Sequence, residues 1–241
     1  MRSEKFMFPN AKGEQLAATL DLPLGKPTAF ALFAHCFTCG KDSLAAKRIA
    51  ERLTIHGVAV LRFDFTGLGS SEGEFANTHF SSNVDDLVAA ADHLRQQYAA
   101  PAILIGHSLG GAAVLAAAHR MTEARAVVTI AAPYDPDHVT GLFKDHIDRI
   151  REQGELEVKL AGRPFKIKKE FLDDVSEKKL DECVATLRKA LLVFHAPTDD
   201  LVGVDNASHI FLAAKHPKSF VSLDGADHLL SKRMTRSMSP M

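Results

Sequence analysis

Two serines stand at the centre of a G-x-S-x-G pentapeptide, the pattern of a nucleophile elbow: Ser108 in Gly106–Gly110 and Ser71 in Gly69–Gly73. An elbow needs a buried strand that runs into a sharp turn and directly on into a helix. Ser108 has this context, because an apolar run precedes it and the alanine-rich stretch 111–120 follows it. Ser71 is followed by residues typical of a loop. We therefore predict that Ser108 is a nucleophile; the alternative for its pentapeptide is a glycine-rich packing turn.

A serine hydroxyl is a weak nucleophile until a base takes its proton, and the base must itself be oriented by an acid. With a nucleophile elbow, the chain order is serine, acid, histidine. The acid is expected in the loop after a late buried strand, and residues 190–195 are such a strand. Asp199 and Asp200 follow it. We favour Asp199; Asp200 is the alternative, with a solvated or helix-capping carboxylate as its other role.

The base must follow the acid, and three histidines do so: His209, His216 and His228. His209 lies within a helical pattern, and His216 directly precedes a strand. His228 lies in the loop 224–228 after the last strand, where a side chain can reach the serine. We predict that His228 is the general base.

Ester or amide chemistry also needs two backbone N–H groups that stabilise the developing oxyanion. One belongs to the residue after the nucleophile, Leu109. The other is expected in the loop after the strand 29–34, where Phe37 supplies the N–H and Cys36 takes the place usually given to glycine.

Cys36-Phe37-Thr38-Cys39 is also a C-x-x-C motif, which occurs in redox pairs and in zinc sites. The only other cysteine is Cys183, so there is no second pair to complete a zinc site and no disulfide framework. We expect Cys36 and Cys39 to pack as small residues in a tight loop, with a redox role as the alternative and no bound metal. The remaining histidines show no metal-ligand spacing.

Short apolar strands alternate with amphipathic helices along most of the chain, which predicts a mainly parallel sheet with helices on both faces, the α/β class. A helix is expected to start near Ser82, with Asp85 in capping-box spacing. The other expected helices span residues 45–57, 111–120 and 204–214. The expected strands span residues 6–8, 15–22, 29–34, 58–63, 102–105, 127–131, 190–194 and 219–223.

Residues 134–189 interrupt this alternation and are predicted to be an inserted cap, leaving 1–133 and 190–241 as the core. The patterns inside the cap indicate a helix over 139–150, a hairpin around the turn Gly162–Pro164 and a helix over 180–187. An insertion at the carboxyl edge of the strands lies where α/β ligand sites form, which favours a lid over a decorative excursion. We expect a modest apolar pocket; the candidate substrate-binding residues are His35, Phe37, His107, Phe143 and Phe165, with Phe171 also in the cap.

The composition excludes several classes of function. The 241 residues carry 29 basic and 30 acidic side chains, a net charge of -1, so nothing points to nucleic acid or an anionic membrane as a partner. No apolar run reaches the length of a membrane-spanning helix, and the N-terminus has no secretory signal. With three cysteines, we expect a reduced, cytoplasmic protein that needs no cofactor.

The sequence resembles the α/β-hydrolases over nearly its whole length. Four stretches carry the resemblance together: 35–42, 62–69, 106–111 and 225–228. They look most like the hydrolase part of bacterial proteins in which an α/β-hydrolase precedes an OsmC-type peroxide-reducing domain, and the cap and loops are similar to those of cinnamoyl and feruloyl esterases. The resemblance implies ester hydrolysis by Ser108, Asp199 and His228; it implies no peroxide chemistry, because it covers the hydrolase part alone.

The predicted function is hydrolysis of a small-molecule ester with a short-to-medium acyl or aryl group. The same residues serve thioester and amide hydrolysis and perhydrolysis, and a non-catalytic hydrolase-fold binding module is the alternative from another class. The helix that α/β-hydrolases place after the catalytic histidine has no counterpart in the pattern, and the residues after Leu230 are expected to be a disordered tail. We expect a homo-oligomer to cover the sheet face left open.

Overall fold

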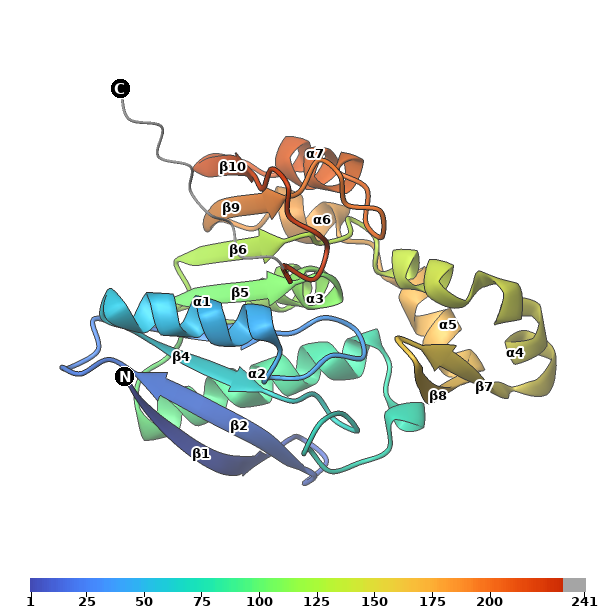
Figure 1. Ribbon diagram of the computed structural model, residues 1–241, viewed down its shortest axis with the longest axis horizontal. Helices are drawn as coiled ribbons and strands as arrows, with labels where there is room; N and C mark the ends of the chain where they lie inside the picture. The colour runs from blue at the N-terminus through green and yellow to red at the C-terminus, as the bar shows by residue number, and fades with distance from the viewer. Residues whose placement is uncertain (232–241) are drawn as a thin grey trace.

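An eight-stranded sheet forms the centre of the computed structural model, which describes residues 1–231 (Figure 1). The strand order is β1-β2-β4-β3-β5-β6-β9-β10. β2 pairs antiparallel with β1 and β4, and all other neighbours pair parallel. The strands are β1 (Arg2–Pro9), β2 (Gln15–Leu22), β3 (Ala29–Ala34), β4 (Val58–Phe63), β5 (Ile103–His107), β6 (Ala126–Ile130), β9 (Ala190–His195) and β10 (Lys218–Ser222). The predicted α/β class and the mainly parallel sheet are confirmed.

The central strands are apolar on both faces because helices cover the sheet from both sides. α1 (Leu44–Ile55) lies on one face, in front of the sheet in Figure 1, and packs Ala46 and Ala50 against Phe33. On the other face lie the helices that share the larger apolar cluster: α2 (Phe80–Gln97), α3 (Leu109–Ala117), α6 (Asp181–Ala185) and α7 (Asp205–Ala213). α3 is buried almost all round, as its alanine-rich sequence predicts.

The start of α2 differs from the prediction. The helix begins at Phe80 and its N-cap is His79, whose ring Nδ1 accepts a hydrogen bond from the Ser82 N–H at 3.1 Å. The Ser82 hydroxyl accepts in return from the His79 N–H at 2.9 Å. The imidazole thus takes the place expected of a serine cap, and Ser82 takes the third helical position expected of Asp85.

The segment between β6 and β9 projects beyond the carboxyl ends of the parallel strands, on the right in Figure 1. Its elements are a 3₁₀ helix, two α-helices and one hairpin: η3 (Pro136–His146), α4 (Ile147–Gln153), β7 (Glu155–Leu160), β8 (Arg163–Lys168) and α5 (Lys169–Glu177). In place of the single helix expected over 139–150, the 3₁₀ helix η3 is followed by α4, and the backbone inside η3 leaves the helical region at Phe143. α6 comes from the same predicted insertion but packs against α3 and α7 of the core. The boundaries of the cap as a separate unit stay a prediction.

The sheet face that carries α1 is only partly covered near β9 and β10. Val128 and Phe194 are partly exposed, and Val221 of β10, which pairs with Phe194, is exposed. The homo-oligomer expected to cover this face stays a prediction. The predicted tail after Leu230 lies, apart from Ser231, outside the described residues. Every helix within residues 1–231 is too short or too polar to span a bilayer.

Candidate active site

Ser108 lies in the sharp turn between β5 and α3. Its backbone has φ +55° and ψ -127°, a conformation that a non-glycine residue rarely adopts. The turn is so tight that a Cβ at Gly106 would lie 2.2 Å from the Gly110 carbonyl oxygen, and one at Gly110 would lie 2.4 Å from the His35 carbonyl oxygen. The small residues of the pentapeptide are therefore required by the close approach of the backbone. Ser71, by contrast, lies in a loop, where its hydroxyl donates to the Asp64 carbonyl and accepts from the Ala17 N–H.

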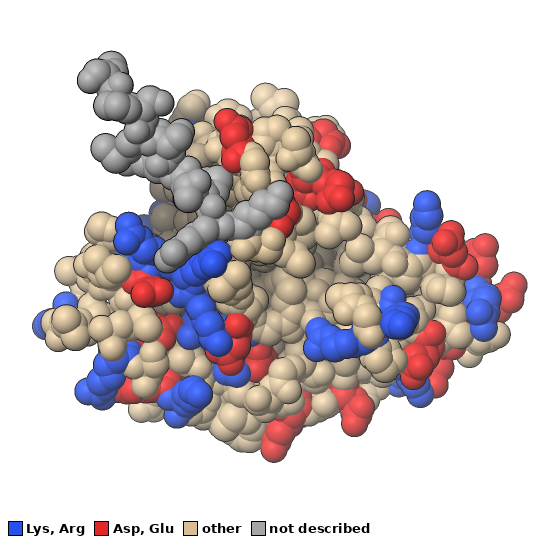
Figure 2. Space-filling view, viewed as in Figure 1, with Lys and Arg blue, Asp and Glu red and all other residues tan. Residues whose placement is uncertain are grey.

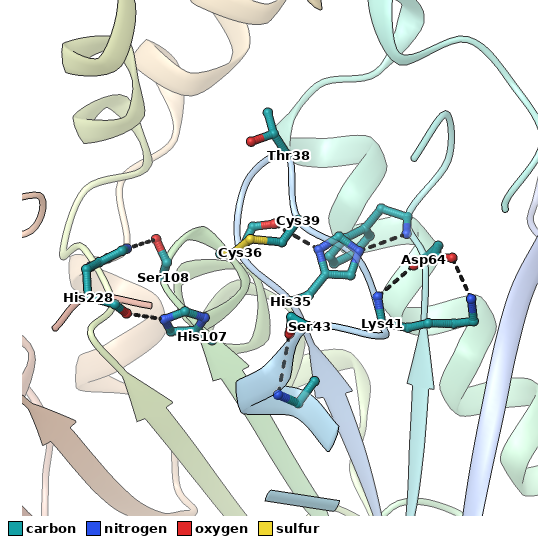
Figure 3. The surroundings of a disulfide bond; sticks show 12 residues. His35, Cys36, Thr38, Cys39, Lys41, Ser43, Asp64, His107, Ser108 and His228 are labelled. Atoms are coloured by element: carbon teal, nitrogen blue, oxygen red, sulfur yellow. Dashed lines mark hydrogen bonds and ion pairs between the residues drawn. A yellow bond between two sulfur atoms is a disulfide. The ribbon is translucent and has the colours of Figure 1, made fainter. Parts of the chain in front are cut away.

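Ser108, His228 and Asp199 form one hydrogen-bonded chain. His228 Nε2 is 2.9 Å from Ser108 Oγ, and His228 Nδ1 is 2.8 Å from Asp199 Oδ2. The three residues follow β5, β10 and β9 at the carboxyl ends of the strands, where parallel sheets place their sites. The contact between Ser108 and His228 is drawn in Figure 3. The arrangement can remove the serine proton and stabilise the imidazolium that results.

The Asp199 carboxylate is held in place by its own turn. Its Oδ1 accepts the N–H groups of Leu201 at 3.0 Å and Val202 at 2.9 Å, which leaves Oδ2 for His228. Burial opposes ionisation, but the bond from His228 and those from the two N–H groups outweigh it and hold the pKa of Asp199 below its ordinary value. The alternative acid, Asp200, is exposed to solvent.

The two other histidines that follow the acid lie outside this chain of hydrogen bonds. His209 is on α7, where its ring packs edge-on against Tyr134 with 5.4 Å between the centroids. His216 precedes Pro217 at the start of β10, at the opposite end of the strand from His228.

The backbone N–H groups of Phe37 and Leu109 donate no hydrogen bond within the described part of the chain. Leu109 is the first residue of α3, and the first N–H groups of a helix have no partner inside it. Phe37 lies in the loop after β3. Both residues line the cavity that contains Ser108, so two unpaired donors are available there to an oxygen that gains negative charge.

The cavity has a volume of about 740 Å³ and opens between the sheet and the inserted segment, where the surface in Figure 2 is hollowed. Ser108 and His228 form part of its wall. Both the core and the inserted segment contribute apolar side chains to the cavity wall. They are Phe37, Leu109, Pro133, Val139, Leu142, Leu160, Ala161, Leu201, Val202 and Leu229. Two cations of the hairpin β7–β8, Lys159 and Arg163, also line it.

Of the five expected substrate-binding residues, Phe37 lines this cavity and the other four lie outside its wall. Phe143 is buried against Phe171, because the kink at Phe143 turns its side chain inward and leaves Val139 and Leu142 at the cavity. Phe165 instead packs edge-on against Phe75, with 4.8 Å between the ring centroids.

His35 and His107, the other two, are buried beneath the site. His35 Nε2 accepts the Phe65 N–H at 3.3 Å, so its Nδ1 carries the proton that is donated to the Cys36 carbonyl at 2.8 Å. His107 Nε2 donates to the His228 carbonyl at 2.7 Å (Figure 3). Each imidazole therefore positions backbone at the site. His35 fixes the loop that carries Phe37, and His107 fixes the backbone of His228.

Burial lowers the pKa of His107 from its usual 6.5 to about 4, because the charged ring is not solvated there. The unfolded chain therefore takes up a proton at this site before the folded chain does as the pH falls. The contribution of neutral His107 to the free energy of unfolding is therefore fully present above pH 6.5. It decreases as the pH falls from 6.5 to 4 and changes no further below pH 4.

We expect the neutral His107 to account for about 3 kcal/mol of the stability lost between pH 6.5 and pH 4, since each pH unit between the two pKa values costs about 1.4 kcal/mol. Urea unfolding of the wild type and His107→Gln across this range measures it. The glutamine amide can still donate to the His228 carbonyl but takes up no proton, so its curve should be flatter. Equal slopes for the two proteins would show that His107 does not titrate as described.

Sequence reasoning assigned no role to Asp64 and Lys41, which anchor the loop after β3. Asp64 is buried and accepts the Lys41 N–H at 2.6 Å, the Lys41 ammonium at 2.9 Å and the Ser70 N–H at 3.0 Å. Burial alone would lower the pKa of Lys41, but Asp64 and Asp42 outweigh it and raise the pKa. In the sequence, only Gly69 hints at this arrangement. Any larger residue there would place its Cβ 2.3 Å from the Asp64 carboxylate.

A third residue to which the sequence assigned no role is His195, at the end of β9. Its Nε2 donates to the Val202 carbonyl at 2.8 Å and lies 3.8 Å from Asp199 Oδ2. It therefore supports the turn that orients Asp199. The i, i+4 spacing to Asp199 is the only sequence signal. Within residues 1–231, no group of three or more His, Cys, Asp or Glu side chains is placed to hold a metal ion.

The expectation for the C-x-x-C motif is wrong in one respect. Cys36 and Cys39 do lie in a tight loop, but they are joined by a disulfide bond (Figure 3). Cys183 is the free cysteine. A pair three residues apart is close enough to bond when the chain turns between its members, and a count of cysteines does not reveal that turn.

The sheet topology and the elbow define an α/β-hydrolase. Residues 25–154 match the family described as serine aminopeptidase, S33, and the chain belongs to this family of α/β-hydrolases.

Three known proteins illustrate the relationship. The esterase domain of a Rhodothermus marinus protein is 51% identical, with 96% of this chain and 91% of that one covered and a TM-score of 0.76. Est1E from Butyrivibrio proteoclasticus, solved with ferulic acid, shares the fold at 22% identity, with 93% and 91% covered and a TM-score of 0.77. Monoglyceride lipase from Homo sapiens is 34% identical over 114 residues, 46% of this chain and 37% of the lipase. The chain thus matches well under half the length of that curated relative.

Proposed function

We propose that this protein is a serine carboxylesterase that cleaves short-to-medium acyl or aryl esters through an acyl-enzyme on Ser108. The observation that carries the proposal is the chain of hydrogen bonds from Ser108 through His228 to Asp199, at the wall of a cavity with two unpaired N–H donors. The 51% identity to a protein titled an esterase domain supports the ester class.

In the proposed mechanism, Ser108 Oγ attacks the ester carbonyl while His228 Nε2 takes its proton. The Phe37 and Leu109 N–H groups stabilise the oxyanion of the tetrahedral intermediate. His228 then gives its proton to the departing alcohol, which leaves the acyl group on Ser108. Water attacks this acyl-enzyme with His228 again as the base, and the acid is released. Asp199 keeps the proton of neutral His228 on Nδ1 and stabilises the imidazolium in both halves.

The lining of the cavity supports small, largely apolar substrates. Val139, Leu142 and Leu160 of the inserted segment line the cavity together with Phe37 of the core. At about 740 Å³ the cavity has the size of a small-molecule site. An acyl or aryl group of modest length can be buried there. The rest of the wall carries charged side chains, among them Lys41, Lys159 and Arg163, and a long acyl chain would lie against them.

Hydrolysis of p-nitrophenyl esters from acetate to decanoate tests the proposal. We expect kcat/KM to be highest for short acyl chains and to fall by at least tenfold towards decanoate. A matching thioester and a matching anilide, assayed beside the best ester, should be cleaved more slowly. A preference for the thioester or the anilide would move the assignment to thioesterase or amidase, and no turnover of any of the three would favour a binding module.

A further inference from the structure

The loop that carries the Phe37 N–H is closed by the Cys36–Cys39 disulfide, with Phe37 and Thr38 inside the ring (Figure 3). The two Cα atoms are 5.3 Å apart, and the Cys39 N–H donates to the Cys36 carbonyl at 3.1 Å. Cys36 and Cys39 line the same cavity as Ser108 and His228. A cross-link therefore spans the backbone donor that the proposed mechanism needs.

Within this ring, the backbone is held in a conformation that the residue types do not favour by themselves. Thr38 has φ +60°, which is unfavourable for a β-branched side chain. No helix or strand includes the segment, and the Phe37 N–H has no hydrogen-bond partner within residues 1–231. The Phe37 N–H shares a peptide plane with the Cys36 carbonyl, which accepts the His35 Nδ1–H and the Cys39 N–H. When the cross-link is opened, Thr38 can return to negative φ and the Cys39 N–H can leave that carbonyl, so His35 alone then orients the plane.

The rest of the loop keeps its place without the disulfide. Lys41 is tied to Asp64 by two hydrogen bonds, and the Cys36 carbonyl is held by His35. Inside the ring, Arg163 of the hairpin donates to the Thr38 carbonyl, so a change in the φ of Thr38 displaces the Phe37 side of the turn. Opening the disulfide is therefore expected to loosen the donor segment while the fold stays intact.

The bond is also open to attack from the cavity. Cys39 is partly exposed, whereas Cys36 is 5% exposed, so a small thiolate reaches the Cys39 sulfur first. Attack there forms a mixed disulfide with Cys39 and releases Cys36 as a thiolate, which takes up a proton. When the reductant is a dithiol, its second thiol closes onto the first, frees Cys39 as a thiol and leaves the dithiol oxidised; two electrons pass to the protein.

From these observations we infer that Cys36 and Cys39 form a redox modification site that sets the competence of the oxyanion hole: the disulfide form is the active esterase, and reduction to two thiols lowers its turnover. This inference rests on the proposed function. Complete loss of one oxyanion donor lowers kcat by about 10²- to 10³-fold, and a loosened donor should cost at least tenfold.

Measuring the oxidised and reduced wild type side by side tests the inference. The protein is reduced with dithiothreitol, desalted without oxygen and assayed with p-nitrophenyl acetate, and its thiols are counted to show the state of the pair. We expect kcat to fall at least tenfold on reduction, KM to change little, and activity to return on reoxidation. Affinity for a trifluoromethyl ketone, whose adduct on Ser108 carries an oxyanion, should fall by a similar factor.

Two variants separate this effect from general damage by the reductant. Cys183→Ser keeps the disulfide and should respond as the wild type does. Cys36→Ser/Cys39→Ser should have the kcat of the reduced wild type, and dithiothreitol should not change it. If this variant does not fold, the comparison of oxidised and reduced wild type is the test. An unchanged kcat in fully reduced, ester-cleaving wild type would overturn the inference and leave the esterase assignment intact. Absence of ester turnover in both redox states would instead overturn the proposed function, and the inference with it.

Discussion

Replacing Ser108 by alanine should lower kcat for p-nitrophenyl acetate by about 10⁴-fold or more, the scale of nucleophile removal in serine hydrolases. The hydroxyl forms the acyl-enzyme in the proposed mechanism, and no other hydroxyl is hydrogen-bonded to His228 in the described structure. Alanine adds no volume and meets the same positive φ as serine. We therefore expect the melting temperature to change little, so that the loss can be assigned to chemistry.

Ser71→Ala is the matched control, because Ser71 has the same pentapeptide pattern but a structural position. Its hydroxyl bonds only backbone groups, of Asp64 and Ala17, so this variant should lose some stability and keep its kcat. Labelling with a fluorophosphonate, read by mass spectrometry, should modify the peptide of Ser108 in the wild type and in Ser71→Ala, and nothing in Ser108→Ala. Label on another serine, or full turnover by Ser108→Ala, would disprove the assignment of the nucleophile.

The parts of the fold that could be predicted are those that short segments determine. The buried strands are continuous apolar runs, and the turn at Ser108 is forced by glycines whose Cβ atoms would clash with backbone. The order of serine, acid and histidine then brings three loops to one edge of a parallel sheet. Ser108, Asp199 and His228 could be nominated for this reason, although they are up to 120 positions apart.

Features that depend on a side chain finding a distant partner could not be predicted. Val139 and Leu142 of η3 line the cavity but Phe143 does not, and the non-helical backbone at Phe143 cannot be predicted from a helical periodicity. His79 caps α2 because its ring accepts the Ser82 N–H, a role that sequence preferences give to other residues. The disulfide depends on the turn at Thr38. Threonine rarely adopts a positive φ, so its residue type does not predict this turn.

The choice between two adjacent carboxylates shows the same limit at the site. Asp199 and Asp200 both follow β9, and the sequence favours Asp199 but leaves Asp200 as the alternative. The structure separates them by burial and by the N–H groups of Leu201 and Val202, which point at one carboxylate and not at the other. The turn around a carboxylate thus decides its orientation, and substituting each aspartate in turn measures which of them catalysis needs.

Asp199→Asn should lower kcat by about 10⁴-fold, as the equivalent change does in a serine protease triad. The asparagine Oδ1 can still accept the N–H groups of Leu201 and Val202, which leaves the amide NH₂ facing His228 Nδ1. A donor in this place requires an unprotonated Nδ1, so the neutral ring carries its proton on Nε2. His228 Nε2 then donates towards Ser108 and can no longer take the serine proton.

The measurement is kcat/KM at pH 8 for Asp199→Asn beside Asp200→Asn. The second variant changes an exposed carboxylate next in sequence and should stay within about twofold of the wild type, since surface substitutions rarely perturb more. Both should keep the wild-type circular dichroism spectrum. If Asp200→Asn is the inactive one, the acid has been assigned to the wrong residue; if both are active, His228 works without an orienting carboxylate and the proposed triad is reduced to a dyad.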